Sequence, residues 1–175
     1  MKYERNQFGD DLGRKKTMKL STKEFEQLMQ TVAEGWNEGT AQKAADCFSQ
    51  DAIYVEPPDK QLYHGRAELY EFFGGDAGTD VPMKMTWHHL AFNEEDQAGF
   101  GEYTFKMHGR YHGIVVVKLE SGLIKHWREY QYRSELDWEE FTNQNSFFFK
   151  TAPAAVLREV SHGAMATHPR RRAAS

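Results

Sequence analysis

The sequence predicts an α+β fold in which helices come first and an antiparallel sheet follows. Apolar residues between positions 21 and 50 repeat at helical spacing, whereas the chain after position 83 contains strand-like runs separated by short polar turns. The clearest turn is Glu120-Ser121-Gly122, which has the length and chemistry of a tight hairpin between the runs 114–119 and 123–132. These observations indicate N-terminal helices followed by a meander of strands, which is an α+β arrangement.

Length and composition set the outer limits of the function. A chain of 175 residues has the size of one domain with additional terminal segments. The net charge of −4 gives no basic field, so we expect no nucleic-acid partner. The single cysteine, Cys47, cannot form an intrachain disulfide and favours a reducing compartment. No run has the length or pattern of a membrane span or a signal peptide, so we expect a soluble, cytoplasmic protein without a membrane partner.

The N-terminal third contains the predicted helices. Residues 1–20 are polar and have no periodicity, so we expect a mobile arm. A capping box from Ser21 to Glu24 begins the first helix, and Gly35 and Gly39 are expected to end it. Thr40 is expected to cap a second, shorter helix. The first helix has one apolar stripe, formed by Phe25, Leu28, Met29, Val32 and Trp36, and the second has a thin apolar edge of Ala41, Ala44, Ala45 and Phe48.

The remaining elements are one strand, one helix and two hairpins. Residues 51–56 alternate as a strand that Pro57-Pro58 ends, so Tyr54 and Glu56 share one face. A loop through His64 leads to a third helix at 66–73, and the runs 83–93 and 98–110 are the strands before the last hairpin. We assign residues 21–149 to the domain and 150–175 to a C-terminal tail, with at most one short helix before disorder.

The last strand carries large side chains on both faces. Strict alternation places Trp127 and Glu129 on one face, together with Leu123, Lys125 and Gln131. A carboxylate beside a tryptophan on a covered face is either satisfied by a partner or chemically useful. We expect the other face to pack on a second copy in a homodimer; its members are Ile124, His126, Arg128, Tyr130 and Tyr132.

The order and spacing of three motifs resemble those of the nuclear transport factor 2-like superfamily. Within it, the chain is most similar to SnoaL-like polyketide cyclases, ketosteroid isomerases and limonene-type epoxide hydrolases, over residues 25–141. The resemblance implies a cone-shaped pocket between a curved sheet and the first helices, on a fold that hosts both enzymes and binding proteins. The motifs are Asp51-Ala-x-Tyr54-x-Glu56-Pro57, His64-Gly65-Arg66-x-x-Leu69, and Gly122-x-Ile124-x-x-Trp127-Arg128-Glu129-Tyr130.

The resemblance implies roles for individual residues. Aligned with ketosteroid isomerases, Glu56 falls at the proton-shuttling carboxylate, whereas Val32 and Ile114 occupy the positions of the oxyanion-hole residues. Aligned with the epoxide hydrolases, Tyr54 matches a water-positioning tyrosine, Trp127 a pocket tryptophan and Glu129 one member of an Asp-Arg-Asp set. Tyr103 and Phe105 replace the other two members, so the sequence departs from both catalytic patterns.

These residues together predict an acid/base site in an aromatic pocket. Glu56, Glu129, Tyr54 and His64 are the catalytic candidates, and burial of two neighbouring carboxyl groups raises the pKa of one of them toward neutrality. The predicted ligand is a small hydrophobic molecule that is isomerised, dehydrated or cyclised without a cofactor. The predicted substrate contacts are Trp36, Tyr103, Phe105 and Trp127.

Other readings of the same residues stay open. Glu56 before two prolines can be solvated or bonded to backbone, Glu129 can pair with Lys125 or Arg128, and the aromatic residues can be ordinary core. The alternative function is a non-catalytic module of the same fold that binds a ligand or assembles as a dimer. His88 and His89 point to opposite faces of one strand, so we expect no metal site there.

Overall fold

The structure is a computed structural model that describes residues 18–56 and 61–143. The chain divides into two compact units, 1–135 and 136–175, which are treated separately. In the second unit, residues 138–143 form a short helix, and the backbone N–H of Phe141 donates to Asp137 O. Most of the predicted mobile arm, Pro57-Pro58 and the predicted tail at 150–175 lie outside the described residues.

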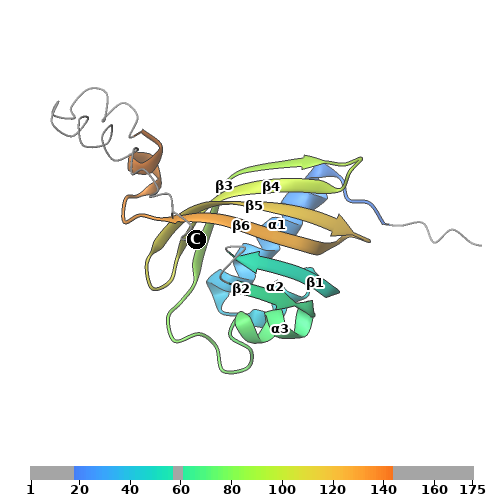
Figure 1. Cartoon of the computed structure of the whole chain (residues 1–175), viewed down its shortest axis with the longest axis horizontal. Coiled ribbons are helices and arrows are strands. Elements are labelled where there is room, and N and C mark those ends of the chain that lie inside the picture. The colour runs from blue at the N-terminus through green and yellow to red at the C-terminus, as the bar shows by residue number, and fades with distance from the viewer. Residues whose placement is uncertain (1–17, 57–60, 144–175) are drawn as a thin grey trace, which may run out of the picture. The chain divides into compact units, whose positions relative to one another are not determined.

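The first unit has the predicted α+β order, with helices α1 and α2 first and a sheet after them (Figure 1). Within residues 18–56 and 61–135 its elements are α1 (Thr22–Glu38), α2 (Ala41–Ala45), β1 (Phe48–Glu56), β2 (Gln61–His64), α3 (Gly65–Phe72), β3 (Lys84–Asn93), β4 (Ala98–Lys106), β5 (Arg110–Glu120) and β6 (Leu123–Arg133). The predicted α+β class is therefore confirmed. β2 was predicted as loop, and Phe48 begins β1 instead of ending α2.

The strands form one sheet in the order β2-β1-β6-β5-β4-β3. Neighbouring strands are antiparallel except β1 and β6, which are parallel, so the prediction of an antiparallel sheet holds for every pair but this one. Strands β3 to β6 form a meander, and β6 is its last strand. β1, which comes earlier in the chain, lies beside β6 and forms the parallel pair with it (Figure 1). This junction brings the Tyr54 motif beside the Trp127 motif.

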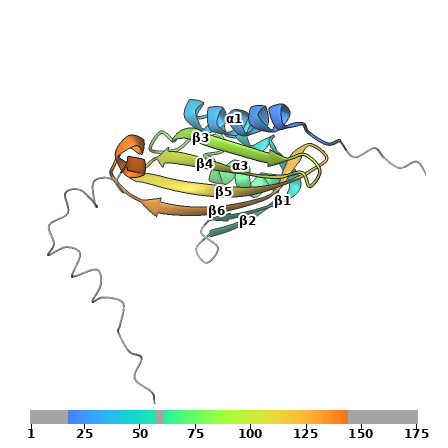
Figure 2. The ribbon, with the colours of Figure 1, turned by 90° about the horizontal axis from the view of Figure 1, so that it is seen from above.

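The helices cover one face of the sheet. α1 packs along β3 and α3 packs against β1 (Figure 2). Inward-facing sheet residues such as Val115, Val117 and Trp127 are fully buried, whereas Ile114 and Val116 on the opposite face are exposed. The core therefore lies between the helices and the inner face of the sheet. No helix in residues 18–56 and 61–143 has both the length and the apolar character that crossing a membrane requires.

Both ends of α1 are capped as the sequence predicts. Ser21 Oγ accepts from Glu24 N, and the Glu24 carboxylate accepts from Ser21 N at 2.8 Å, which completes the capping box. Gly39 ends the helix in the left-handed region at φ 70°. Just before the helix, Leu20 exchanges two hydrogen bonds with the side chain of Gln97, so the last residue of the predicted arm is attached to the β3–β4 turn.

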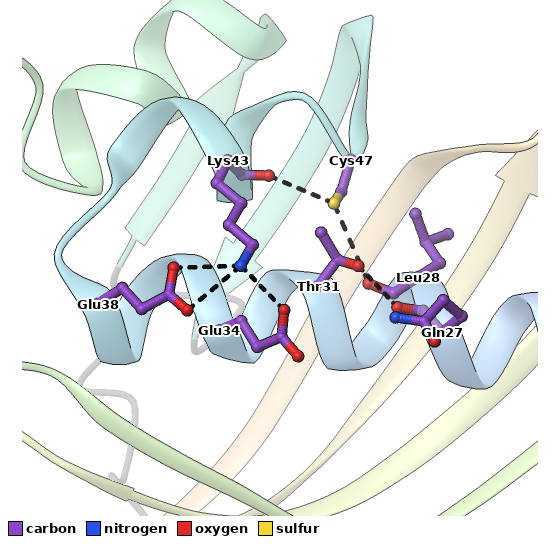
Figure 3. A network of polar contacts seen from close by, with 7 residues as sticks. All are labelled: Gln27, Leu28, Thr31, Glu34, Glu38, Lys43 and Cys47. Carbon is purple, nitrogen blue, oxygen red and sulfur yellow. Dashed lines mark hydrogen bonds and ion pairs between the residues drawn. The ribbon is translucent and has the colours of Figure 1, made fainter.

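Gly35 does not end α1, because the helix continues to Glu38. It is instead the contact point between α1 and α2, where an added Cβ would lie 2.6 Å from Ala44 N. Beside this contact, Lys43 of α2 forms ion pairs with Glu34 and Glu38 of α1 (Figure 3). The close approach of the two backbones thus needs glycine at position 35.

A β-bulge changes the predicted faces of β6. The register between β5 and β6 shifts so that Lys118 pairs with His126 and Leu119 pairs with Ile124, which leaves Lys125 as the extra residue. Ile124 and Trp127 therefore both point into the core, and both are fully buried. The prediction that Ile124 belongs to the outer face is wrong, because strict alternation does not hold across a bulge.

Candidate active site

The inner face of the sheet and the helices line a partly open cavity of about 430 Å³. This volume lies in the range of small-molecule sites, which is about 300–1,000 Å³. The cavity is lined by side chains from α1, α3 and the six strands of the sheet, and most of them are aromatic residues or methionines. Two carboxylates, Glu56 and Glu129, are the acidic groups in this lining.

The parallel pairing of β1 and β6 places the two carboxylates next to each other. Tyr54 pairs with Trp127 across the two strands, and their rings stack at 5.6 Å between centroids. Side chains two residues further along each strand project from the same face, and these are Glu56 and Glu129. The motif Tyr-x-Glu on one strand is therefore aligned with the motif Trp-x-Glu on its neighbour.

Each carboxylate is held by donors from its own surroundings. Trp127 Nε1 donates to Glu129 Oε1 at 2.8 Å, and the Tyr54 hydroxyl donates to Glu56 Oε2 at 3.4 Å. The side-chain amide of Gln131 donates to Glu56 Oε1. Glu56 therefore accepts hydrogen bonds from an amide and a phenol, and both stabilise its negative charge. Glu129 accepts its hydrogen bond from the indole N–H of Trp127.

Burial controls the protonation of both carboxyl groups. Glu129 is only 4 % exposed, and burial, with the neighbouring charge of Glu56, raises the pKa of Glu129 to about 8. Burial also raises the pKa of Glu56, but its hydrogen bonds from Gln131 and Tyr54 act in the opposite direction. Near pH 7 this arrangement favours a protonated Glu129 beside an ionised Glu56, because the two groups resist carrying two negative charges in one cavity.

The two tyrosines near the carboxylates remain protonated. Burial raises the pKa of Tyr54 and of Tyr103 well above the usual value of a phenol, and the charges of Glu129 and Glu56 add to both shifts. Both hydroxyls also lower the pKa of Glu129 by interacting with its ionised form, although burial has the larger effect. These two side chains can therefore donate hydrogen bonds over the whole physiological pH range.

Two donors in the cavity lining lack a hydrogen bond of normal geometry. Among the described residues, Trp36 Nε1 and Tyr103 Oη are the buried side-chain nitrogen and oxygen atoms without a hydrogen bond of normal geometry. Trp36 is 5 % and Tyr103 is 1 % exposed, so water at the protein surface does not satisfy them. Trp36 packs edge-on against Phe73, Phe105 and Trp127.

The structure brings six of the eight predicted site residues to the cavity. These six lining residues are Trp36, Tyr54, Glu56, Tyr103, Phe105 and Glu129. Trp127 lies behind the lining, where it is fully buried beneath Tyr54 and holds Glu129 through its indole N–H. Its predicted contact with substrate is therefore replaced by a contact with the carboxylate.

His64 lies away from the cavity. Gln61 is the β2 residue in the cavity lining, and His64, three positions later, projects from the opposite face of the strand. Its side chain is exposed, and its backbone N–H donates to the Glu68 carboxylate at 2.7 Å. The structure thus leaves the predicted catalytic histidine without access to the two glutamates.

Several lining residues were not predicted from the sequence. Gln131 could have been found, because it follows Glu129 by two positions on the same face of β6. The methionines carry no comparable signal, since their spacing does not distinguish a cavity wall from ordinary core. The additional lining residues include Phe72, Phe73, Met83, Met85, Met107 and Tyr111.

The histidines on the outer part of the sheet form pairs and a chain of hydrogen bonds. His89 contacts Glu102 at 2.7 Å, and Thr104 Oγ1 lies 2.8 Å from His88 Nε2 and 3.1 Å from His112 Nδ1. In residues 18–56 and 61–143, no three His, Cys, Asp or Glu side chains are grouped as the ligands of a metal ion. Each of these three histidines therefore has a hydrogen-bond partner on a neighbouring strand of the sheet.

The fold and the paired motifs define the class of protein. The family of SnoaL-like domains matches residues 29–127, which is more than half of the chain, so the protein belongs to this family. The resemblance stated from the three motifs is thereby confirmed. No curated protein matches the sequence.

Solved structures with the same fold include both enzymes and uncharacterised proteins. A protein of unknown function with a cystatin-like fold from Methylobium petroleophilum is 19 % identical, with a TM-score of 0.58, and the match covers 89 % of this chain and 100 % of that one. A protein from Kribbella flavida, provisionally named a ketosteroid isomerase, is 16 % identical with a TM-score of 0.55, over 66 % of this chain and 83 % of that one.

A third similar structure is the epoxide hydrolase/cyclase-like enzyme SalBIII, which has a role in pyran ring formation in the polyether salinomycin. It is 18 % identical with a TM-score of 0.55, and the match covers 63 % of this chain and 92 % of that one. At these identities the similarity establishes the fold, which is nuclear transport factor 2-like, and leaves the chemistry to the residues of the site.

Proposed function

We propose that this protein is an enzyme that moves protons on a small, apolar, oxygenated molecule, in an isomerisation, dehydration or cyclisation. The observation that carries this proposal is the pair Glu56 and Glu129 in one aromatic cavity, with Glu129 almost completely buried. Enzymes use such pairs because two carboxyl groups in different environments can act as acid and base at the same pH.

The surroundings of the two carboxyl groups assign the roles. Glu56 accepts hydrogen bonds from Gln131 and Tyr54, which favour its ionised form, so Glu56 is the general base. Glu129 has the more strongly raised pKa, about 8, and therefore carries the proton near neutral pH as the general acid. Glu56 takes a proton from the substrate and Glu129 delivers one to a second atom of it. No part of this transfer needs a cofactor.

The size of the expected effect is that of general acid–base catalysis. A positioned proton donor or acceptor contributes about 10²–10⁴ to the rate. The aromatic lining adds a low-polarity environment that holds a hydrophobic substrate against the two carboxyl groups. The provisionally named ketosteroid isomerase and the cyclase-like enzyme among the similar structures support a proton-transfer reaction on this fold.

Deuterium exchange tests the proposal without knowledge of the natural substrate. A panel of cyclic ketones, enones and hydroxy ketones is incubated with the protein in D₂O, and the loss of C–H signals is followed by ¹H NMR. We expect faster exchange than in buffer for at least one compound. Glu56→Gln and Glu129→Gln should each slow it by about 10²-fold or more, whereas Tyr70→Phe, outside the cavity lining, should not.

Two results would contradict the proposal. One is the absence of accelerated exchange for every compound of the panel. The other is exchange that both glutamine variants retain at the wild-type rate. Tight binding of a panel compound without exchange would instead identify the alternative function, a ligand-binding module that uses the same cavity without chemistry.

We also propose that a second copy of the chain covers the outer face of the sheet. The outer-face patch consists of large apolar side chains that are 38–66 % exposed, and its members are Phe100, Ile114, Val116, Tyr130 and Tyr132. β5 forms the middle of the patch, because Val116 pairs with Phe100 on β4, and Ile114 pairs with Tyr130 on β6. Contiguous apolar surfaces of this kind are typical of protein interfaces.

The charges around the outer-face patch favour a second copy over an unrelated partner. Arg128 lies on the β6 side of the patch, over the Tyr130 ring at 5.8 Å, and Glu102 lies on the β4 side in the row of Ile114. A twofold axis along β5 exchanges the β4 and β6 sides. It therefore brings the cation of one copy toward the acidic side of the other, which makes the surface complementary to itself.

A cytoplasmic location is part of the proposal. Cys47 is 5 % exposed, and burial raises the pKa of its thiol to about 12, so this cysteine is a small buried side chain. The described fold thus relies on packing and contains no cross-link, as is usual for proteins of a reducing compartment.

A further inference from the structure

We propose that the cavity selects uncharged ring compounds that carry an acceptor oxygen, and that Tyr103 Oη and Trp36 Nε1 bind this oxygen. The proposal names the substrate class of the site described above and therefore rests on the proposed function of that cavity. It concerns how the ligand is recognised, which can be measured independently of turnover.

The location of the unpaired donors is the main argument. In folded proteins nearly all buried polar groups have a hydrogen-bond partner, so each exception calls for an explanation. Among the described residues there are two such atoms, and both belong to side chains that line the same cavity. Trp36 comes from α1 and Tyr103 from β4, so two separate elements each bring such a donor to the cavity lining. A ligand in the cavity is a partner that would satisfy both.

The chemistry of the donors defines what the ligand must offer. An indole N–H can donate a hydrogen bond and cannot accept one, so Trp36 requires an acceptor atom. The phenol of Tyr103 stays protonated at physiological pH and is likewise available as a donor. A ketone, ester or ether oxygen meets both requirements, whereas a pure hydrocarbon leaves both donors unpaired.

The two carboxyl groups of the cavity disfavour an anionic oxygen beside them. Glu56 and Glu129 lie in the same lining, and each already raises the cost of negative charge at the other. A carboxylate or phosphate on the ligand near them would add another negative charge. Arg133 also belongs to the lining, but its side chain is 64 % exposed and pairs with Glu135 at 3.9 Å. The walls favour an apolar ring system, since aromatic residues such as Phe72, Phe73 and Phe105 surround the two donors and the two carboxyl groups.

A matched pair of probes tests the proposal. 1-Tetralone and tetralin have the same fused rings and differ in one carbonyl oxygen. We expect the wild-type protein to bind 1-tetralone more tightly. Tyr103→Phe removes the hydroxyl and keeps the ring, so it should weaken 1-tetralone binding by about 3- to 10-fold, the value of one hydrogen bond, and leave tetralin binding unchanged. Tyr70→Phe, whose hydroxyl contacts Asp76, is the control.

Hydrogen bonding by the second donor, Trp36 Nε1, is measured in the wild-type protein. Trp36→Phe changes a packed core residue, so its effect on folding would complicate a measured affinity. In ¹⁵N-labelled wild-type protein, the indole N–H resonance of Trp36 should move on addition of 1-tetralone and stay in place with tetralin. The resonance is assigned from the one indole signal that is missing in the Trp36→Phe spectrum.

The outcomes separate recognition from catalysis. Equal affinity for the two probes, no binding of either, or an equal effect of Tyr103→Phe on both would overturn the assignment of the donors. Loss of the deuterium-exchange activity with an intact preference for 1-tetralone would leave this assignment standing and remove the proposed catalysis. The reverse pattern would retain catalysis and show that the oxygen is bound elsewhere.

Discussion

Gly113 of β5 lies directly beneath the ring of Tyr103 on β4, its partner in the sheet. A Cβ atom at position 113 would lie 2.6 Å from Tyr103 Oη and 2.7 Å from its Cζ. The tyrosine therefore crosses over β5 at the one position of the pairing where no side chain stands in its way. Glycine inside a strand often marks such a close approach. In this protein it places a phenol where it acts on the Glu129 carboxyl group.

Gly113→Ala should displace the Tyr103 hydroxyl. We expect a loss of unfolding free energy of about 1–3 kcal/mol, as for other overpacked sites, and a weaker preference for 1-tetralone over tetralin. Urea unfolding and probe binding measure the two effects. Gly109→Ala is the matched control, because its Cβ would meet the mobile end of the Arg133 side chain, which can move aside. Equal effects of the two substitutions would contradict the assigned role of Gly113.

Glu129 should make the stability of the protein depend on pH. Its pKa is about 4.5 for a free glutamate side chain and about 8 in the fold. Below pH 4.5 the group is protonated in both states, so the full stability is present. Between pH 4.5 and about 8 the unfolded chain is ionised while the folded group keeps its proton, so the stability falls by up to about 1.4 kcal/mol per pH unit, and the loss is complete above the folded pKa.

Glu129→Gln removes this titration and keeps an acceptor for Trp127 Nε1. The variant should therefore gain unfolding free energy relative to wild type as the pH is raised from 5 to 8, on the order of a few kcal/mol. Urea unfolding at pH 5, 6.5 and 8 gives the comparison. A difference between the two proteins that stays constant with pH would argue against a buried, protonated Glu129.

Gly35→Ala tests the junction of α1 and α2. Helix propensity alone would favour alanine by about 1 kcal/mol, but the new Cβ would lie 2.6 Å from the backbone nitrogen of Ala44. Overpacking costs about 1–3 kcal/mol, so we expect net destabilisation in thermal and urea unfolding. Lys43→Met, which removes the exposed ion pairs shown in Figure 3, should have the smaller effect. The opposite order would mean that the charges hold the helices together.

The proposed dimer depends on the outer-face patch. Ile114→Lys introduces a charge in the middle of this patch, at a residue that is 44 % exposed and outside the core. We expect the variant to elute as a monomer in size exclusion with light scattering, while the wild type elutes as a dimer. Leu62→Lys, at a similarly exposed position on β2, is the control and should remain a dimer. A monomeric wild type would rule out the second copy.

Local sequence signals predicted most of the fold. The capping box at Ser21, the left-handed cap at Gly39 and the hairpin turn at Gly122 are each determined by a few neighbouring residues, and all three are present. The errors arise where distant residues decide. Gly35 is set by its contact with Ala44, and the face of Ile124 is set by a bulge against β5.

Local sequence signals also predicted part of the candidate site. Alternation placed Tyr54 with Glu56 and Trp127 with Glu129, but alternation alone does not say that the two strands are neighbours. The expectation that the two strands lie close together came from the resemblance to a known fold. In the structure, the parallel pairing of β1 and β6 makes them neighbours. The unpaired donors of Trp36 and Tyr103 could not be predicted, because an absent partner is a property of packing in three dimensions.

The central claim is that Glu56 and Glu129 share one cavity and affect each other's protonation. A ¹³C NMR titration of protein labelled at the glutamate carboxyl carbon tests it most directly, with Glu129→Gln identifying the resonance. We predict a midpoint near pH 8 for Glu129 and a lower midpoint in Glu56→Gln, because the neighbouring charge is gone. A midpoint near 4.5, or one that Glu56→Gln does not move, would contradict the account.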